Sequence, residues 1–400
     1  LVRTAPELYR KYVQLVNGKS ILYVKLRKAL YGTLRASLLF WQHLTGKLQE
    51  WGFVLNPYDT CVANKTIDGK QCTILWHVDD LKISHVDPQV VTDILDLLNE
   101  VYGEIAPLVV TRGKRHDYLG MVLDFGTEGE VKIEMKDYIE KMLTDLPPDM
   151  AGESVTPAAA HLFDISDDPV KLDEPKAQVF HFYTAKLLFM CKRARPDVQT
   201  PVAFLTTRVQ GPDEDDWKKL GRVMKYLNGS REVVLTLSAD DTQIIKWWID
   251  GSFATHHDMR GHTGGLMTLG KGAAYSTSIK QKLNTKSSTE TEVVSVDDVL
   301  PQVLWTRYFM DAQGYGVKDS VVYQDNLSAM LLEKNGKGSS GKRTRHINIR
   351  YFFVKDRIGN KELSIEHCPA EHMVADFFTK PLQGKDFRKF RDLIMNLKKS

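Results

Sequence analysis

Four carboxylates in the last third of the chain stand beside apolar segments that a folded protein would bury. Asp250 ends "IIKWWID" and Asp325 follows "SVVYQ", two segments apolar enough to be central strands. Glu292, with Glu290 as its rival, lies in the first turn of the predicted helix "SSTETEVV", and Asp376 lies in "HMVADFFTKPL". Burying like charges together is unfavourable unless a cation compensates them. If the four converge, the sequence predicts a two-metal site for phosphodiester hydrolysis, with ions roughly 3.5–4 Å apart and water as the nucleophile.

Each of these carboxylates also has a plainer explanation. Asp250 and Asp325 are typical of loops in which strands stop. Glu292 is typical of a helix N-terminus, where its charge contributes only about 0.3–1 kcal/mol. For any one residue taken alone we favour the plainer explanation. The order strand, helix, strand, helix favours the metal site for the four together.

A further acidic pair, Asp79 and Asp80, lies in "ILWHVDDLKISH", between an apolar run and an alternating one. This pattern predicts a β-hairpin, and on pattern alone an Asp-Asp turn is the favoured explanation, because Asp tolerates tight-turn backbone angles. The functional alternative is that the paired carboxylates supply oxygen ligands for Mg²⁺ in phosphoryl transfer.

Composition limits the classes of protein that need to be considered. The chain has 400 residues, of which 42% are hydrophobic and 26% charged, which predicts two or three folded domains. The net charge of +3 means that affinity for nucleic acid must come from local basic patches. The four cysteines lack C-x-x-C spacing, which argues against a zinc module and for a reducing compartment. No apolar run is long enough to cross a membrane.

The order of predicted elements divides the chain into three parts. Residues 1–146 alternate strands and helices in a β-α-β-β order, which predicts an α+β fold. Residues 147–232 begin with a stretch rich in Pro, Asp, Ala and Ser, interpreted as a linker, and continue with helices. Residues 233–400 place short strands first and mixed strands and helices later, which predicts one sheet flanked by helices.

The segment "GKRTRHINIRYFFVK" interleaves basic and aromatic residues, a pattern suited to phosphate contact. The candidate nucleic-acid ligands in it are Lys342, Arg343, Arg345, His346 and Arg350. A solvated helix face over a stripe of core residues explains the pattern equally well.

Several motifs, in order across nearly the whole chain, resemble the Pol polyproteins of Ty1/copia-type retrotransposons. The segments "LRKALYGTLRASLLFWQHL", "WHVDDLKI" and "DYLGMVL" resemble the reverse transcriptase part of this family. The segment "LLFMCKRARPDVQTPVAFLTTRV" is similar to the part that follows it. The segments "SSTETEVVSV", "YQDNLSAM", "KRTRHINIRYFFVKD" and "HCPAEHMVADFFTKPL" resemble its ribonuclease H block.

The resemblance implies a fold and a function for each part. Residues 1–146 would be the remainder of a polymerase palm, residues 147–232 a linker and helical thumb or connection, and residues 233–400 a ribonuclease H-like α/β domain. Asp79 and Asp80 would be the polymerase pair, whereas Asp250, Glu292, Asp325 and Asp376 would be the ribonuclease H site. The implied cofactor is Mg²⁺, or Mn²⁺. The implied partners are an RNA–DNA hybrid, an RNA template, a DNA primer and, in a competent polymerase, deoxynucleotides, but no membrane.

Departures from the family pattern limit these expectations. The family's first polymerase aspartate lies upstream of the first residue here, so we expect no DNA synthesis by this chain alone. His77 stands where the family has Tyr or Phe, and Ser37 where it has Pro. The alternatives are an inactive remnant that binds nucleic acid and a DNA-cutting transposase of similar fold. The resemblance implies a cytoplasmic location, in virus-like particles, or a nuclear one.

Overall fold

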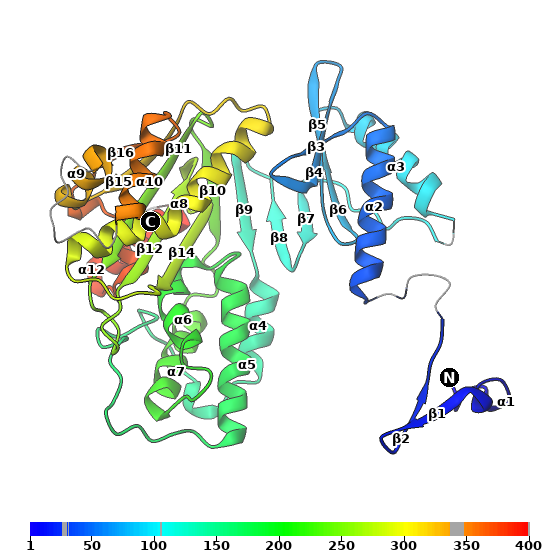
Figure 1. The fold of residues 1–400 in the computed structure, drawn as a ribbon, viewed down its shortest axis with the longest axis horizontal. Coiled ribbons are helices and arrows are strands. Elements are labelled where there is room, and N and C mark those ends of the chain that lie inside the picture. Colours follow the sequence, from blue (N-terminus) through cyan, green and yellow to red (C-terminus); the bar gives the residue numbers. More distant parts are fainter. Residues whose placement is uncertain (26–29, 31, 105, 337–347, 399–400) are drawn as a thin grey trace. The chain divides into compact units, whose positions relative to one another are not determined.

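The computed structural model describes residues 1–25, 30, 32–104, 106–336 and 348–398 (Figure 1). The chain forms two compact units, Leu1–Val101 and Tyr102–Ser400. Within the described residues, no helix is both long enough and apolar enough to cross a membrane.

The first unit contains a four-stranded antiparallel sheet and two long helices. The sheet has the order β3-β4-β5-β6. The elements of this unit are α1 (Pro6–Tyr9), η1 (Arg10–Tyr12), β1 (Val13–Val16), β2 (Lys19–Leu22), α2 (Leu34–Glu50), β3 (Val54–Asn56), β4 (Asp59–Ile67), β5 (Lys70–His77), β6 (Asp80–Ser84) and α3 (Pro88–Tyr102). Helix α2 begins at Thr33, whose side chain accepts a hydrogen bond from the amide of Ala36. Leu44, Leu48 and Ile74 are fully buried in this unit.

The second unit begins with an antiparallel sheet of five strands in the order β13-β10-β9-β8-β7. Its strands are β7 (Arg115–Tyr118), β8 (Met121–Asp124), β9 (Glu130–Glu134), β10 (Leu235–Ala239) and β13 (Gly270–Lys271). Between β9 and β10 lie α4 (Lys136–Thr144), η2 (Pro148–Met150), α5 (Glu174–Cys191), η3 (Pro196–Val198), α6 (Gln199–Thr206) and α7 (Glu214–Gly229). Helix α7 begins with a capping box formed by Asp213 and Asp216, as its acidic first turn predicts.

A second five-stranded sheet, in the order β14-β12-β11-β15-β16, organises the C-terminal part. Its strands are β11 (Ile244–Ser252), β12 (His262–Thr268), β14 (Tyr275–Lys280), β15 (Asp319–Gln324) and β16 (Ser364–His367). Strands β11, β12 and β14 pair antiparallel, whereas β15 pairs parallel with both β11 and β16. The helices are α8 (Ser288–Ala312), α9 (Leu327–Asn335), α10 (Asn348–Gly359), η6 (Ala370–His372), α11 (Asp376–Thr379) and α12 (Gly384–Met395).

The alternation of side chains along β11 explains why helices cover both faces of this sheet. Ile245, Trp247 and Ile249 are fully buried in one hydrophobic cluster with residues of α8. Trp248 points to the other face and packs against the cluster that contains Phe377 of α11. A central strand that is apolar on both faces is typical of a sheet covered on both sides.

The predicted boundaries at residues 146 and 232 both fall inside the second unit. Strand β9 pairs with β10 across them, with Ile133 opposite Leu235. The segment interpreted as a linker lacks regular strands and α-helices but is not detached, because Met150, Leu162 and Phe163 are buried in the same core. The prediction of α+β structure followed by a mixed sheet with flanking helices is confirmed. The functional division into residues 1–146, 147–232 and 233–400 stays a prediction.

A buried chain of hydrogen bonds connects two strands of the second sheet to α11. His256 Nε2 lies 2.9 Å from His262 Nδ1, and His262 Nε2 lies 2.7 Å from Ser278 Oγ. Ser278 in turn donates to the carbonyl oxygen of Phe378 at 2.7 Å. Burial lowers the pKa of His256 to about 4 and that of His262 to about 3. Both imidazoles are therefore neutral in the folded protein near pH 7.

We expect acid to destabilise the fold through this histidine pair. Below pH about 6.5 the two histidines bind protons in the unfolded protein but stay neutral in the folded one. The free energy of unfolding therefore decreases as the pH falls from about 6.5 toward 4. In His256→Gln, the decrease in the free energy of unfolding between pH 6.5 and 4.5, measured with urea, should be smaller by roughly 1–3 kcal/mol. Exposed His181→Gln is the control. An unchanged pH dependence in His256→Gln would contradict this explanation.

Candidate metal centre

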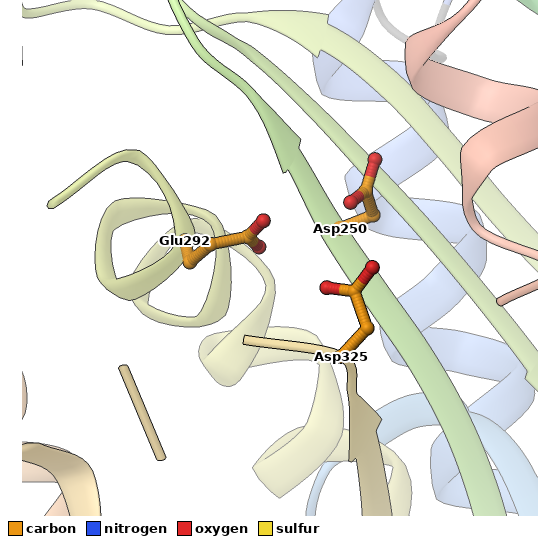
Figure 2. Close-up of side chains that lie close together, drawn as sticks. All are labelled: Asp250, Glu292 and Asp325. Carbon is orange, nitrogen blue, oxygen red and sulfur yellow. The ribbon is translucent and has the colours of Figure 1, made fainter. Parts of the chain in front are cut away.

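Three acidic side chains from separate elements converge at one end of the second sheet. One carboxylate oxygen each from Asp250, Glu292 and Asp325 lies within 4.8 Å of the other two. Figure 2 shows the three groups pointing toward one another, Asp250 from β11, Glu292 from α8 and Asp325 from the end of β15. Asp250 and Glu292 are only 2% and 5% exposed. The predicted convergence is therefore present for these three residues.

A glycine brings α8 close enough to β11 for this arrangement. A Cβ atom on Gly251 would lie 2.5 Å from Ser295 Oγ and 2.9 Å from the carbonyl oxygen of Thr291. Only a residue without a side chain therefore fits between strand and helix. Ser295, the small residue three positions after Glu292, is fully buried at this contact.

The rival glutamate in the same helix has a different place. Glu290 accepts a hydrogen bond from the backbone amide of Lys286 at 2.7 Å, and it is not part of the cluster of three carboxylates. The geometry therefore favours Glu292 as the metal ligand, and the catalytic role of either residue remains a prediction.

The fourth predicted carboxylate, Asp376, lies beside the cluster rather than in it. It is half-buried at the start of α11, and its Oδ1 accepts a hydrogen bond from Lys380 Nζ at 2.6 Å. Burial, together with the negative charges of Asp250 and Asp325, raises the pKa of Asp376 to about 6. Asp376 is therefore electrostatically coupled to Asp250 and Asp325, two of the three converging groups.

The cluster carries more negative charge than its protein surroundings neutralise. Burial raises the pKa of Glu292 well above its ordinary value, and the charges of Asp250, Asp325 and Glu333 add to the effect. Burial and Asp250 also raise the pKa of Asp325. Glu292 Oε2 is buried and accepts no hydrogen bond from the residues that the structure describes. An orphaned carboxylate oxygen among hard oxygen donors fits a divalent cation such as Mg²⁺.

Two polar residues of this site were missed in the sequence. Thr379 Oγ1 donates a hydrogen bond to Asp250 Oδ2, across 129 positions of the chain. Burial alone would lower the pKa of Lys380. The pKa is nevertheless raised, because the negative charges of Asp250, Asp376 and Asp325 stabilise the protonated form by more. The available signal was the spacing of Lys380 four residues after Asp376 in "DFFTK", which brings the two together on a helical turn.

A second glycine lets α11 approach the sheet. A Cβ atom on Gly264 of β12 would lie 2.7 Å from Thr379 Cγ2 and 2.8 Å from the carbonyl oxygen of Ala375. Gly264 is the pairing partner of Asp250 in the antiparallel ladder. The close approach of α11 therefore occurs directly beside Asp250.

Asp79 and Asp80 lie at the tip of the predicted hairpin, as expected from the pattern. His77 pairs with Asp80, which leaves Val78 and Asp79 as the two-residue turn. Val78 adopts the left-handed conformation with φ of 57°, and both aspartates are exposed. Within the described parts of the chain, neither belongs to a cluster of three groups with metal-ligand spacing. The turn is confirmed, and the metal-binding role stays a prediction.

Most of the basic candidate ligands, Lys342, Arg343, Arg345 and His346, lie outside the described residues. Arg350, on α10, forms an ion pair with Asp297 of α8. Its neighbour Tyr351 is fully buried, so this part of the segment does cover a stripe of core residues.

Comparison with known proteins relates the chain to transposon polyproteins. It is 25% identical over 386 residues to the Retrovirus-related Pol polyprotein from transposon TNT 1-94 of Nicotiana tabacum, covering 95% of this chain and 28% of that protein. It is 27% identical over 372 residues to the Retrovirus-related Pol polyprotein from transposon RE1 of Arabidopsis thaliana, covering 92% of this chain and 25% of that protein. The chain thus spans about a quarter of the length of these relatives.

A shorter relative and solved structures extend the comparison. The putative transposon Ty5-1 protein YCL074W of Saccharomyces cerevisiae is 24% identical over 293 residues, covering 72% of this chain and 92% of that protein. The N-terminal RNase H domain of rv2228c from Mycobacterium tuberculosis covers 34% of this chain and 90% of its own, with 12% identity and a TM-score of 0.24. The native Prototype Foamy Virus protease-reverse transcriptase covers 91% of this chain and 41% of its own, with 16% identity and a TM-score of 0.23.

No family model matches the chain. The predicted ribonuclease H-like mixed sheet agrees with the strand order β14-β12-β11-β15-β16 and its parallel and antiparallel pairs. Relatives of one kind cover more than nine tenths of the sequence. The chain is therefore a homologue of the Pol polyproteins of Ty1/copia-type transposons.

Proposed function

We propose that the second unit hydrolyses the RNA strand of RNA–DNA hybrids with the help of Mg²⁺ or Mn²⁺. The observation that carries this proposal is the convergence of Asp250, Glu292 and Asp325 within 4.8 Å. Asp250, Glu292 and Asp325 would hold the divalent ions, with Asp376 at the edge of the site. Likeness to Pol polyproteins supports the choice of a nucleic-acid substrate.

The protein groups in this site prepare an anionic, rigid receptor. The Thr379 hydroxyl fixes one oxygen of Asp250, and Lys380 holds Asp376 through an ion pair at 2.6 Å. Close packing of α8 and α11 on the sheet keeps these carboxylates from relaxing apart. When bound, divalent ions supply an activated water and neutralise the charge that develops on the phosphate. Lys380 has a raised pKa and stays protonated beside Asp376.

Cleavage of labelled substrates by the intact chain tests this function. An RNA–DNA hybrid labelled on the RNA strand should be cut in Mg²⁺ or Mn²⁺ and remain intact in EDTA. Single-stranded RNA and duplex DNA of the same sequence are the controls. Binding of the hybrid without cleavage would instead support an inactive remnant, whereas cleavage of duplex DNA would support a transposase.

We further propose that Asp79 and Asp80 serve DNA synthesis only together with a third carboxylate, because within the described residues neither belongs to a group of three side chains with metal-ligand spacing. Both are exposed at a hairpin tip, where a template and primer have access. Nucleotide incorporation by this chain alone in a primer-extension assay with Mg²⁺ should therefore be below detection. Robust incorporation would contradict this prediction. By resemblance alone, the proposed place of action is the cytoplasm, in virus-like particles, or the nucleus.

A further inference from the structure

A large groove lies between α12 and the face of the second sheet that carries Asp250. Its volume is about 910 Å³, within the range typical of ligand pockets. Its lining includes Trp248, Leu266 and Tyr323 from three neighbouring strands and Lys385, Arg388 and Lys389 from α12. In Figure 1, α12 is the red helix near the end of the chain. Neither the proposed cleavage nor the carboxylate cluster accounts for this groove.

The floor of the groove is an aromatic pair in register with the carboxylates. Trp248 of β11 and Tyr323 of β15 are directly paired in the parallel ladder, and their rings stack with centroids 4.9 Å apart. Each aromatic residue precedes a carboxylate, Asp250 or Asp325, by two positions and therefore shares its face of the sheet. The aromatic pair and the two carboxylates are therefore roughly 7 Å apart along the strands. This separation corresponds to about two nucleotide steps in a stacked nucleic-acid strand.

One wall of the groove is shared with the carboxylate site. Cys368, which lines the groove, donates its backbone amide to the carbonyl oxygen of Gln324, the residue before Asp325, at 2.8 Å. Burial raises the pKa of the Cys368 thiol, and the charges of Asp325 and Asp376 contribute to this shift. The groove is thus a direct neighbour of the site and not a distant cavity.

The charge of the groove is complementary to phosphate. Four cationic side chains line it, and they are Lys271, Lys385, Arg388 and Lys389. Among the described lining residues the single carboxylate is Asp392, which is held by Arg391 at 2.7 Å. Lys385, Arg388 and Lys389 are exposed on α12, and Lys389 Nζ donates a hydrogen bond to the carbonyl oxygen of Glu371. Aromatic faces beside a row of cations are typical of sites for single-stranded nucleic acid.

We propose that this groove binds single-stranded nucleic acid that continues from the carboxylate site. Bases stack on Trp248 and Tyr323, and phosphates contact the cations of α12. The proposal rests on the proposed function, because a strand that is cut at Asp250 and Asp325 must leave across an adjoining surface. In this proposal the groove guides the strand and takes no part in the hydrolysis.

Equilibrium binding of a fluorescein-labelled 12-nucleotide RNA, measured by anisotropy in EDTA, tests the cationic wall without cleavage. The triple variant Lys385→Gln/Arg388→Gln/Lys389→Gln should bind this RNA roughly tenfold or more weakly. A plot of the logarithm of affinity against the logarithm of salt concentration should have a shallower slope for this variant. The difference should be up to about 2, because each lost phosphate contact reduces the slope by roughly 0.7. A control variant, Lys141→Gln/Lys218→Gln, removes exposed cations elsewhere in the same unit.

A second measurement tests the aromatic floor. The RNA should quench tryptophan emission of the parent, and Trp248→Phe, which keeps a ring in the half-buried position, should lose most of that quenching. Trp248→Leu should weaken binding by roughly tenfold. Trp305→Leu is the matched control, because Trp305 also stacks on a neighbour, Phe309 of α8, at 5.0 Å. A DNA oligonucleotide of the same sequence shows whether the groove prefers one type of strand.

The outcomes separate this proposal from the proposed function. Unchanged RNA affinity in the α12 triple variant, or equal losses in the control variants, would refute the groove as a nucleic-acid site and favour a peptide occupant. If the groove variants lose affinity while the parent cuts no hybrid, the binding proposal stands and the cleavage proposal fails.

Discussion

Asp250→Asn and Asp325→Asn are each expected to reduce the rate of hybrid cleavage by roughly a thousandfold or more. Asparagine keeps the size of the side chain, but it replaces an anionic oxygen with an NH₂ group and removes one negative charge from the cluster. Because the three converging groups have ligand atoms within 4.8 Å of one another, a single substitution alters the whole cation receptor. Single-turnover cleavage of a labelled hybrid in Mg²⁺ measures the loss.

A surface aspartate provides the control for this experiment. Asp240→Asn removes a carboxylate whose ion pair with Lys246 is partly exposed, and its cleavage rate should match that of the parent. Circular dichroism should show all three variants folded, because neutralising Asp250 or Asp325 removes repulsion with Glu292, and an asparagine at position 250 still offers an oxygen to the hydroxyl of Thr379. If Asp250→Asn and Asp325→Asn both cut as fast as the parent, the assignment of the site is wrong.

The sequence predicted the carboxylate cluster because each acidic residue has a local signal. Asp250 and Asp325 follow apolar runs, and such runs become central strands whose ends meet at one edge of a sheet. The Ser-rich stretch before Glu292 predicted a helix start there, but α8 begins at Ser288 and its first turn contains Glu290, so the prediction that Glu292 lies in the first turn is wrong by a few residues. These inferences use only residues close together in the chain, so they need no knowledge of packing.

The missing parts of the site depend on contacts between distant segments. The hydrogen bond from Thr379 to Asp250 spans 129 positions, and no local pattern specifies such a contact. Gly251 and Gly264 look like ordinary strand glycines in the sequence, yet each is required by a helix that packs against it. The stacking of Trp248 on Tyr323 likewise depends on the register between β11 and β15. Register and helix approach are set by the whole core.

The supposed linker illustrates the same limit. Its Pro, Asp and Ala content correctly predicted a lack of regular strands and α-helices, but composition could not show that Leu162 and Phe163 are buried. These apolar side chains anchor an irregular segment to helices that come later in the chain. A continuous core therefore extends across a stretch that appears, by composition, to separate two domains.

The "RPD" segment contains a buried ion pair that is expected to have a large effect on stability. Arg195 is 1% exposed, and it donates to both carboxylate oxygens of Asp197 at 2.8 Å. It also donates to the hydroxyl and the carbonyl oxygen of Ser230, just after α7. Tyr226 of α7 donates to Asp197 at 2.7 Å. This network fixes η3 against α7 inside the core.

Asp197→Asn should lower the free energy of unfolding by about 3–5 kcal/mol, because it leaves the buried guanidinium of Arg195 without a compensating charge. Urea unfolding of parent and variant measures the difference. The matched control is Glu214→Gln, which breaks the partly exposed pair with Lys176 and should cost about 1 kcal/mol or less. The double variant Arg195→Leu/Asp197→Leu should be more stable than Asp197→Asn, since no buried charge is left unpaired. If Asp197→Asn lowers the free energy of unfolding by no more than Glu214→Gln does, the charge of Arg195 is stabilised by groups other than Asp197.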